Sequence, residues 1–538
     1  MNTQDQLLHV SGLRIEAKSE GIWKPLVHEL DLELRKGEVL GLIGESGAGK
    51  STIGLAAMGY ARPGCRIAAG TILFDGRDLA LASEAERTKL RGSRIAYVAQ
   101  SAAAAFNPAH RLIEQCTEVA VEHQVKTKDA ASRDAIALYK EMRLPEPESI
   151  GFRYPHEVSG GQLQRAMTAM AMICQPDLII FDEPTTALDV TTQIEVLASI
   201  RGIVERHHTA AIYISHDLAI VAQMADRIMV LQNGRLVEQA PTRTMLSAPR
   251  EIYTQTLWAV RQFKTVEKAR TAAESPQLSV SDLNASYGLV KVLKDVSFDV
   301  FPQRTVAVVG ESGSGKSTLA KVIAGLLPAR SGQVALDGKP LPTSYKNRSI
   351  EELRSIQLVH QMPDAALNPK QTVGTIIERP LKLYTGLNAK ARGERIAELL
   401  SLLELEPREY IGRRPAQLSG GQKQRVCIGR ALAAEPRLMI CDEVTSALDQ
   451  IVTEGILKLL ARIQSELGIS YIFITHDLTL VRAIADEVVV MKDGVVVEAG
   501  SKSSVIASPR SPYTKLLLSA VPEMDPDWLT RRLRTRLE

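Results

Sequence analysis

The sequence contains little cysteine and no long apolar run. Its five cysteines are scattered over 538 residues without a C-x-x-C pair. This usage is typical of a reducing compartment and argues against a metal site held by cysteines. No stretch of about 18 apolar residues occurs, so the sequence predicts no helix that spans a membrane. The cysteines are Cys65, Cys116, Cys174, Cys427 and Cys441.

The sequence also lacks an excess of charge of either sign, and its opening residues do not match the pattern of a leader. The 65 Lys and Arg against 62 Asp and Glu give a formal net charge of +3, so no overall field favours nucleic acid. The opening MNTQDQLLHV has neither a basic segment nor a long apolar one, and therefore predicts no secretion signal. Length and ordinary hydrophobic content (45%) predict several globular domains, cytosolic unless a partner holds the chain elsewhere.

One motif, G-x-x-x-x-G-K-[ST], is present twice, at 44–51 and 310–317. Each copy follows a short apolar run that predicts a buried parallel strand, and each precedes a potential helix. Glycines let backbone N–H groups converge on phosphate, and the helix N-terminus adds partial positive charge. The lysines can reach phosphates, and the final serines can offer a hydroxyl to Mg²⁺. A Gly-rich turn could match once by chance, but two matches in this context favour nucleotide binding.

The chain repeats itself once. The motif lysines are 266 residues apart (316 − 50), and the later motifs are 260 apart (for example 442 − 182). The same order of features at matched spacing predicts two tandem domains. We place them at 1–262 and 277–538, joined by a polar linker at 263–276.

Each repeat opens with alternating apolar residues that predict strands, and an aromatic ring there could stack on a purine. Tyr287 is the candidate in the second repeat, and Trp23 is a weaker one in the first. A half-buried strand aromatic is about as well supported for Tyr287 and better supported for Trp23.

A glutamine ends a later predicted strand in each repeat, Gln100 and Gln361, ahead of an Asn-Pro turn and a largely helical region. Its amide oxygen could reach Mg²⁺ or a water, although such a residue alone is usually part of an ordinary loop. The helical region ends at SGGQ, 159–162 and 419–422. The serine can cap the next helix, and the free amides behind it form an anion site. A simple N-cap would explain one copy but not two so alike.

A buried strand then ends on two acids, Asp182-Glu183 and Asp442-Glu443. Open α/β sheets bind ligands at this end of their strands. The first acid suits Mg²⁺, and the second suits polarising a water that attacks phosphate. A histidine follows 33 residues after each Glu (216 − 183 and 476 − 443) at the end of another strand. The matched spacing favours a role at the phosphate over a structural one.

With these residues in place, the chain resembles the ATP-binding cassette ATPases over nearly its whole length, since six features recur in order, twice. The resemblance implies two P-loop α/β domains, each with a mixed sheet core, an antiparallel β subdomain and an α-helical subdomain. It also implies D-loops at Asp189 and Asp449. One departure, Val444 where the first repeat has Pro184, alters a turn and not the chemistry.

The resemblance implies ATP and Mg²⁺ as ligands and assigns site residues. Catalysis falls to Glu183, Glu443, His216 and His476, and Mg²⁺ to Ser51, Gln100, Asp182, Ser317, Gln361 and Asp442. Nucleotide binding, with Tyr287 added, falls to Gly44, Glu45, Ser46, Gly47, Ala48, Gly49, Lys50, Ser51, Thr52, Gly310, Glu311, Ser312, Gly313, Ser314, Gly315, Lys316, Ser317, Thr318, Gln100, Gln361, Ser159, Gly160, Gly161, Gln162, Ser419, Gly420, Gly421 and Gln422.

The implied mechanism is head-to-tail closure of the two repeats on two ATPs. Lys50 and Glu183 would share one site with Ser419, and Lys316 and Glu443 would share the other with Ser159. Because both repeats keep lysine, carboxylate and histidine, the sequence predicts two competent sites.

Two similar tails, 247–257 and 508–517, and the Asn-Pro turns are similar to the dipeptide/oligopeptide importer ATPases of bacteria, including members with both cassettes fused. Many relatives carry an iron–sulfur centre in this tail, but no cysteine follows Cys441, so none is expected. The resemblance implies two membrane permeases docked near 101–116 and 362–377 and, indirectly, a periplasmic solute-binding protein. The protein would be peripheral, at the cytoplasmic side of the inner membrane, and would not bind nucleic acid.

Two alternatives stay open. One is a soluble tandem ATPase acting on ribosomes or DNA, although such relatives carry a long basic linker or coiled coils that this chain lacks. The other is the same importer with nickel, glutathione or oligosaccharide as cargo, which a binding protein and permeases would select. The basic segment 531–536 is interpreted as a solvated helix end, with contact to anionic lipid as the alternative.

Overall fold

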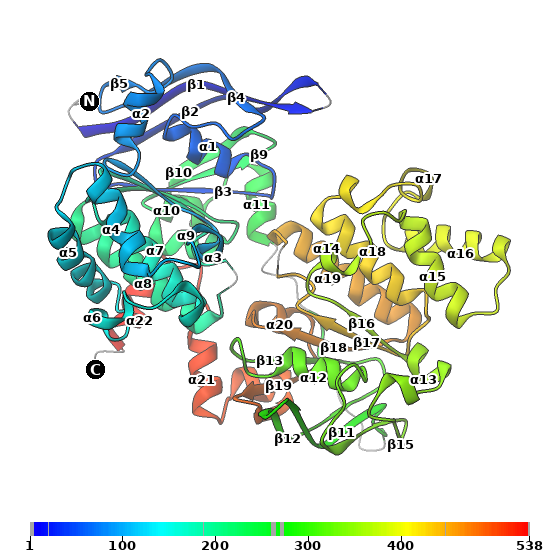
Figure 1. Cartoon of the computed structure of the whole chain (residues 1–538). Helices are drawn as coiled ribbons and strands as arrows, with labels where there is room; N and C mark the ends of the chain where they lie inside the picture. Colours follow the sequence, from blue (N-terminus) through cyan, green and yellow to red (C-terminus); the bar gives the residue numbers. More distant parts are fainter. Residues whose placement is uncertain are drawn as a thin grey trace. The chain divides into compact units, whose positions relative to one another are not determined.

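The computed structural model describes residues 5–19, 21–186, 188–259, 265–268, 274–446 and 448–535. The chain divides into two compact units (Figure 1). Unit 1 comprises Met1–Leu188, Thr192–Ala259 and Pro522–Glu538, and unit 2 comprises Asp189–Thr191 and Val260–Val521. Much of the predicted linker, including 269–273, lies outside the described residues.

The core of unit 1 is a six-stranded mixed sheet in the order β10-β9-β3-β8-β7-β6. Its central strands are short, mostly apolar runs whose residues are buried throughout, as expected for strands covered on both faces. All neighbours are parallel except β10, which pairs antiparallel with β9. The strands are β3 (Val39–Gly44), β6 (Ile95–Val98), β7 (Leu178–Asp182), β8 (Ala210–Ile214), β9 (Arg227–Gln232) and β10 (Arg235–Pro241).

A second, antiparallel sheet of unit 1 has the order β2-β1-β4-β5. Its strands alternate buried and exposed residues, because only one face packs on the core. That face and helix α1 (Lys50–Ala57) share one hydrophobic cluster with the six-stranded sheet, which fixes α1 between the two sheets. The strands are β1 (Gln6–Ser19), β2 (Ile22–Arg35), β4 (Cys65–Phe74) and β5 (Arg77–Asp78).

Helices α4, α5 and α7 of unit 1 pack against one another and form its helical part (Figure 1). The helices of unit 1 are α2 (Glu84–Leu90), α3 (Ala102–Ala105), α4 (Leu112–Glu122), α5 (Lys128–Glu141), α6 (Pro147–Ile150), α7 (Gly160–Met172), α8 (Val190–His207), α9 (Leu218–Met224), α10 (Thr242–Ser247), α11 (Ile252–Ala259) and α22 (Trp528–Thr535), with a 3-10 turn at Pro155–Glu157.

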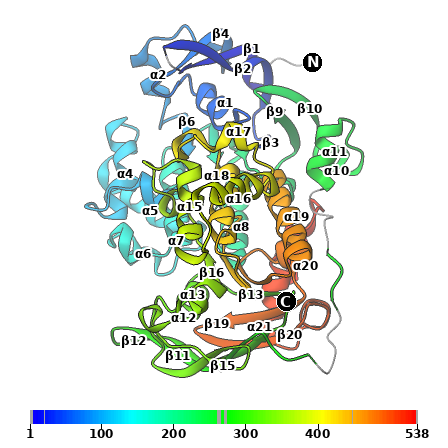
Figure 2. The same ribbon diagram turned by 90° about the vertical axis from the view of Figure 1, so that its right-hand side faces the viewer.

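Unit 2 repeats this design with sheets in the orders β16-β17-β18-β13-β19-β20 and β12-β11-β14-β15. The antiparallel strands β11, β12 and β15 and the helices α15, α16 and α18 lie at opposite ends of the unit (Figure 2). The strands are β11 (Leu278–Tyr287), β12 (Val290–Val300), β13 (Thr305–Val309), β14 (Ser331–Leu336), β15 (Lys339–Pro340), β16 (Ile356–Val359), β17 (Leu438–Asp442), β18 (Ser470–Thr475), β19 (Glu487–Lys492) and β20 (Val495–Ser501).

The helices of unit 2 follow the same plan, so the expected fold class of two tandem α/β cassettes is confirmed. Within the described ranges, no helix combines the length and apolar character needed to cross a membrane. The helices are α12 (Lys316–Ile323), α13 (Ile350–Ser355), α14 (Pro363–Ala366), α15 (Val373–Tyr384), α16 (Ala389–Leu402), α17 (Pro407–Tyr410), α18 (Gly420–Leu432), α19 (Gln450–Leu467), α20 (Leu478–Ile484) and α21 (Pro512–Ser519), with 3-10 turns at Tyr345–Asn347 and Pro415–Gln417 and a π-helical turn at Ser503–Ala507.

Candidate active sites

The phosphate loop of each unit joins a central strand to a helix, β3 to α1 and β13 to α12. Its first glycine has a positive φ, 156° at Gly44 and 154° at Gly310. A Cβ at Gly44 would lie 2.1 Å from the carbonyl oxygen of Leu231, and one at Gly310 would lie 2.2 Å from that of Met491. Backbone conformation and close approach therefore both require glycine where each loop begins.

Each loop lysine is buried and turns back over its own loop. Lys50 Nζ donates hydrogen bonds to the carbonyl oxygens of Gly44 at 2.7 Å and Glu45 at 2.8 Å. Lys316 Nζ makes the same two bonds, both at 2.8 Å, to Gly310 and Glu311. Burial lowers the pKa of Lys316 from its usual value, although nearby carboxylates oppose the shift. The ammonium group is thus held at the loop whose amides could bind an anion.

The first acid of each pair meets the hydroxyl that ends the phosphate loop. Ser51 Oγ donates to Asp182 Oδ1 at 2.7 Å, and Ser317 Oγ donates to Asp442 Oδ1 at 3.0 Å. Both carboxyl groups are buried at the ends of β7 and β17. Burial raises the pKa of Asp442, and the hydrogen bond from Ser317 opposes it. A hydroxyl and a carboxylate held together offer the hard oxygen ligands that Mg²⁺ prefers.

The second acid gathers two more predicted residues around it. In unit 1, Gln100 Nε2 donates to Glu183 Oε2 at 2.9 Å, and His216 Nδ1 lies 3.1 Å from Glu183 Oε1. Glu183 has a φ of 49°, in the left-handed region, which is uncommon for a residue with a side chain and often marks functional sites. Unit 2 repeats the cluster with distances of 2.7 Å and 3.3 Å, from Gln361 and His476 to Glu443.

The glutamate and histidine of each cluster shift each other's pKa. Burial alone raises the pKa of Glu183, but the hydrogen bond and charge of His216 outweigh burial and lower it from the usual 4.5. Burial alone lowers the pKa of His216, but its bond to Glu183 raises it above the usual 6.5. The pKa of Glu443 is lowered and that of His476 is raised in the same way. In each cluster the two shifts thus favour the ionised carboxylate and the protonated imidazole together, as an ion pair.

We expect Glu183→Gln to lower the pKa of His216, because burial then acts without the hydrogen bond to, and charge of, the Glu183 carboxylate. In the wild type the pKa of Glu183 is lowered. The contribution of the ion pair to the stability of the fold is therefore lost as the pH falls through that pKa. The raised imidazole pKa means that it also disappears as pH rises through that value. Histidine NMR titration without nucleotide or Mg²⁺ measures the pKa of His216 in the wild type and in Glu183→Gln. His216→Asn identifies the signal that belongs to His216. An unchanged His216 pKa in Glu183→Gln would contradict the pairing.

Sequence analysis missed Tyr97, which distinguishes the two sites. Its hydroxyl donates to Asp182 Oδ2 at 2.6 Å, on the oxygen that Ser51 does not use. Burial, and then this bond, raise its pKa well above the usual range. Leu358 takes the matching register position, opposite Ile440 as Tyr97 is opposite Ile180. The only indication in the sequence was a tyrosine inside an otherwise apolar strand. Its partner, Asp182, could be identified only once the structure showed that β6 and β7 are neighbours.

The signature segments cap the helices that follow them. Ser159 Oγ accepts a hydrogen bond from the Gln162 amide at 3.3 Å, and Gln162 Oε1 accepts one from the Ser159 amide at 3.0 Å. Ser419 and Gln422 form the same capping box. A Cβ at Gly161 would lie 2.1 Å from Thr192 Cγ2, so the second glycine lets α7 approach α8. In each unit the signature thus begins a helix of the helical part, α7 or α18.

The two candidate base-stacking aromatics lie in different surroundings. Tyr287 ends β11 and is 46% exposed. The ring of Trp23 has Arg66 at 4.3 Å and Lys18 at 5.9 Å from its centroid. Stacking of Tyr287 on a purine stays a prediction, whereas Trp23 already has cations against its ring.

A tyrosine from each tail contacts the phosphate loop, a role that sequence analysis did not foresee. The Glu45 amide donates to the Tyr253 hydroxyl at 3.3 Å, and the Glu311 amide donates to the Tyr513 hydroxyl at 3.2 Å. Both tyrosines lie in tail helices, α11 and α21. The repeated tail is therefore part of the site as well as a family feature.

Comparisons with known proteins agree with this geometry. The family described as "ABC transporter" matches residues 27–186 and 293–446, and "Oligopeptide/dipeptide transporter, C-terminal region" matches 497–537. The chain is 37% identical to the glutathione import ATP-binding protein GsiA of Salmonella choleraesuis (strain SC-B67), covering 97% of this chain and 90% of that one. The GsiA proteins of Pectobacterium atrosepticum (36% identical, 100% and 92%) and Escherichia coli strain K12 (35%, 93% and 87%) are similarly related.

These matches span both repeats and the tail, as the sequence predicted. The family binds and hydrolyses ATP, and its importers pair such subunits with membrane permeases. The chain belongs to the ABC transporter family, as the ATP-hydrolysing subunit of a peptide-type importer that carries two ABC domains in one polypeptide.

Proposed function

We propose that this chain hydrolyses Mg²⁺-ATP at two competent sites and thereby drives import of peptides or glutathione-like molecules through two permeases. The observation that carries the proposal is the Gln–Glu–His cluster, built with the same hydrogen-bond geometry in both units. The C-terminal region supports the peptide class of cargo, and the names of the relatives support glutathione. A periplasmic binding protein would deliver the cargo, and the chain would work at the cytoplasmic side of the inner membrane.

The proposed chemistry assigns one task to each group. The loop amides and Lys50 would bind the phosphates, and Ser51 and Asp182 would hold Mg²⁺, which supplies positive charge that neutralises the phosphates. Glu183 orients and polarises the attacking water, and His216 keeps that carboxylate ionised and in place. Gln100 donates to Glu183 and would help to orient this carboxylate. Unit 2 would do the same with Lys316, Ser317, Asp442, Glu443, His476 and Gln361. Each signature serine would complete the partner site only when the halves close.

Two observations test the importer and its cargo. Genes beside this one are expected to encode two permeases and a periplasmic binding protein, and a ribosome-associated operon in their place would contradict the proposal. The complex reconstituted in vesicles should hydrolyse ATP faster when the binding protein carries a dipeptide, an oligopeptide or glutathione. The ligand that gives the largest stimulation identifies the cargo, and stimulation by nickel or an oligosaccharide alone would favour those alternatives.

We expect Tyr97→Phe to weaken Mg²⁺ binding at the first site by about tenfold, because hydrogen bonds to a ligating carboxylate orient it. Mn²⁺ titration of the nucleotide-loaded protein, followed by EPR, counts the two sites and their affinities. Leu358→Phe, at the matching position of unit 2, is the control and should leave both affinities unchanged. Equal Mn²⁺ affinities in wild type and Tyr97→Phe would show that the tyrosine has no part in metal binding.

A further inference from the structure

The end of the chain packs into unit 1, although it follows the second repeat in sequence. Gln223 of α9 is 3% exposed, and both polar atoms of its side-chain amide make hydrogen bonds to this segment. Its Nε2 donates to the carbonyl oxygens of Glu523 and Asp525, both at 2.9 Å, and its Oε1 accepts from the Leu529 amide at 3.0 Å. Because one buried amide makes three hydrogen bonds to this segment, the segment is held at a specific position in unit 1.

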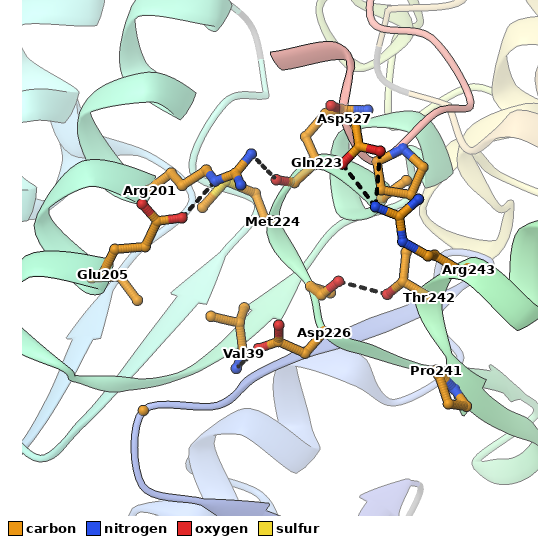
Figure 3. Close-up of a pocket in the computed structure, with 15 residues that line it drawn as sticks. Val39, Arg201, Glu205, Gln223, Met224, Asp226, Pro241, Thr242, Arg243 and Asp527 are labelled. Atoms are coloured by element: carbon orange, nitrogen blue, oxygen red, sulfur yellow. Dashed lines mark hydrogen bonds and ion pairs between the residues drawn. The ribbon is translucent and has the colours of Figure 1, made fainter. Parts of the chain in front are cut away.

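An ion pair and two apolar side chains complete the attachment. Arg243 Nη2 lies 2.8 Å from each carboxylate oxygen of Asp527, and Figure 3 shows the two side chains pointing toward one another. Leu529 is wholly buried and Trp528 is 7% exposed. A cavity of about 410 Å³ next to the pair is lined by α9, β10 and the segment itself, including Asp527. The segment 522–535 thus fits unit 1 through both polar and apolar groups.

The linker does the same in unit 2, at positions that correspond by the repeat offset of 260. Thr265 donates from its amide and its hydroxyl to the carbonyl oxygen of Ala483, at 2.7 and 2.9 Å. Ser503 donates from its amide and hydroxyl to the Glu267 carboxylate, at 3.1 Å each. Ala483 corresponds to Gln223 (483 − 223), Ser503 to Arg243 (503 − 243), and Asp527 to Glu267 (527 − 267).

Further contacts fix the linker in unit 2. The Lys268 amide donates to Asp486 Oδ1 at 3.0 Å, and Lys268 Nζ donates to Gln464 Oε1 at 2.8 Å. Arg304 donates to the Lys268 carbonyl oxygen at 2.8 Å. The stretch 265–268 is therefore an anchored segment of unit 2 and not merely a tether between domains.

We infer that the surface formed by α9, β10 and α10 is a docking site for the C-terminal extension of the other repeat, and that the two extensions are exchanged straps. Residues 265–268 follow the first repeat's tail, as 525–528 follow the second's, yet each segment packs in the unit built from the other repeat. The straps keep the two repeats associated when no nucleotide links them. This retention is separate from hydrolysis and does not depend on the cargo.

The experiment cuts the polypeptide between the two repeats and measures whether the straps alone keep the two fragments together. A protease site is placed within 269–273 of the full chain, and the folded protein is cut in EDTA without nucleotide. The fragments should remain together on a size-exclusion column through dilution to nanomolar concentrations. Arg243→Glu should weaken association at least tenfold, and adding Asp527→Arg should restore it by reversing the ion pair. Arg235→Glu, at an exposed arginine that begins β10, is the matched control and should have no effect.

Two further variants keep the result interpretable. Ending the chain after Val521 should release the fragments more readily than Arg243→Glu, because the buried Leu529 and the Gln223 bonds are lost together. Glu267→Lys tests the second strap and should also weaken association. Circular dichroism and ATP binding confirm that each uncut variant is folded. If the cut wild-type fragments separate as readily as the truncated protein, the strap inference is wrong.

Discussion

Glu183→Gln and Glu443→Gln should each lower steady-state ATP turnover by at least about tenfold, since a positioned base contributes roughly 10²–10⁴-fold to a proton transfer. Glutamine keeps the shape of the side chain and can still accept from the neighbouring Gln100 or Gln361. The substitution therefore removes the charge and leaves the backbone unchanged. Each loss should exceed one half, because both sites must be reset for the halves to complete a cycle.

The same measurement shows whether the two ATP sites depend on each other, work independently, or turn over at only one of them. Phosphate release is followed at saturating Mg²⁺-ATP for wild type, each single variant and the double variant. Glu466→Gln, an exposed glutamate on α19, is the control and should retain full turnover. A loss of about one half from each single variant would show independent sites. A loss from only one of them would show that the other site does not turn over, contrary to the proposal.

Lys50→Met and Lys316→Met should each remove high-affinity ATP binding from one site. Hydrogen bonds to charged groups contribute about 1.5–3 kcal/mol, so losing the ammonium should weaken binding roughly 10- to 100-fold. Methionine keeps most of the buried stem, and the two carbonyl oxygens that each lysine bonds lie within its own loop. The fold should therefore survive the change.

Equilibrium titration with a fluorescent ATP analogue counts the sites. Wild type should bind two equivalents, each single variant one, and the double variant none at the same concentration. Lys128→Met, on the exposed start of α5, should still bind two. Two tight equivalents in Lys316→Met would show that the second loop binds nucleotide without its lysine.

Short apolar strands and their following motifs could be predicted because local pattern determines them. The runs before Gly44 and Asp182 are buried throughout, and a residue at the end of such a strand must lie at the same sheet edge as its neighbours. The duplication added to this, since every feature appeared twice at matched spacing. The meeting of Gln100, Glu183 and His216 at one point follows from that edge.

Other parts of the sites depend on which strands and helices lie side by side, and a linear sequence does not specify that. Tyr97 reaches Asp182 because β6 and β7 are neighbours, although 85 residues separate the two (182 − 97). The tail tyrosines reach the phosphate loops over more than 200 residues, as Tyr253 does to Glu45. The exchange of the extensions is harder still to predict, because nothing in either segment's sequence specifies which of the two repeats it packs against.

The late position of the C-terminal extension has a consequence for how the chain is made. Gln223 and Arg243 are synthesised with the first repeat, but their partners in 523–529 leave the ribosome between 284 and 306 residues later. At about 5–20 residues per second this interval lasts roughly 15–60 s. Throughout that interval the nascent first repeat must therefore expose the side-chain amide of Gln223, which is buried in the full chain, and the apolar surface that later covers Leu529. Chaperone binding to ribosome-bound chains should end only when the last residues emerge.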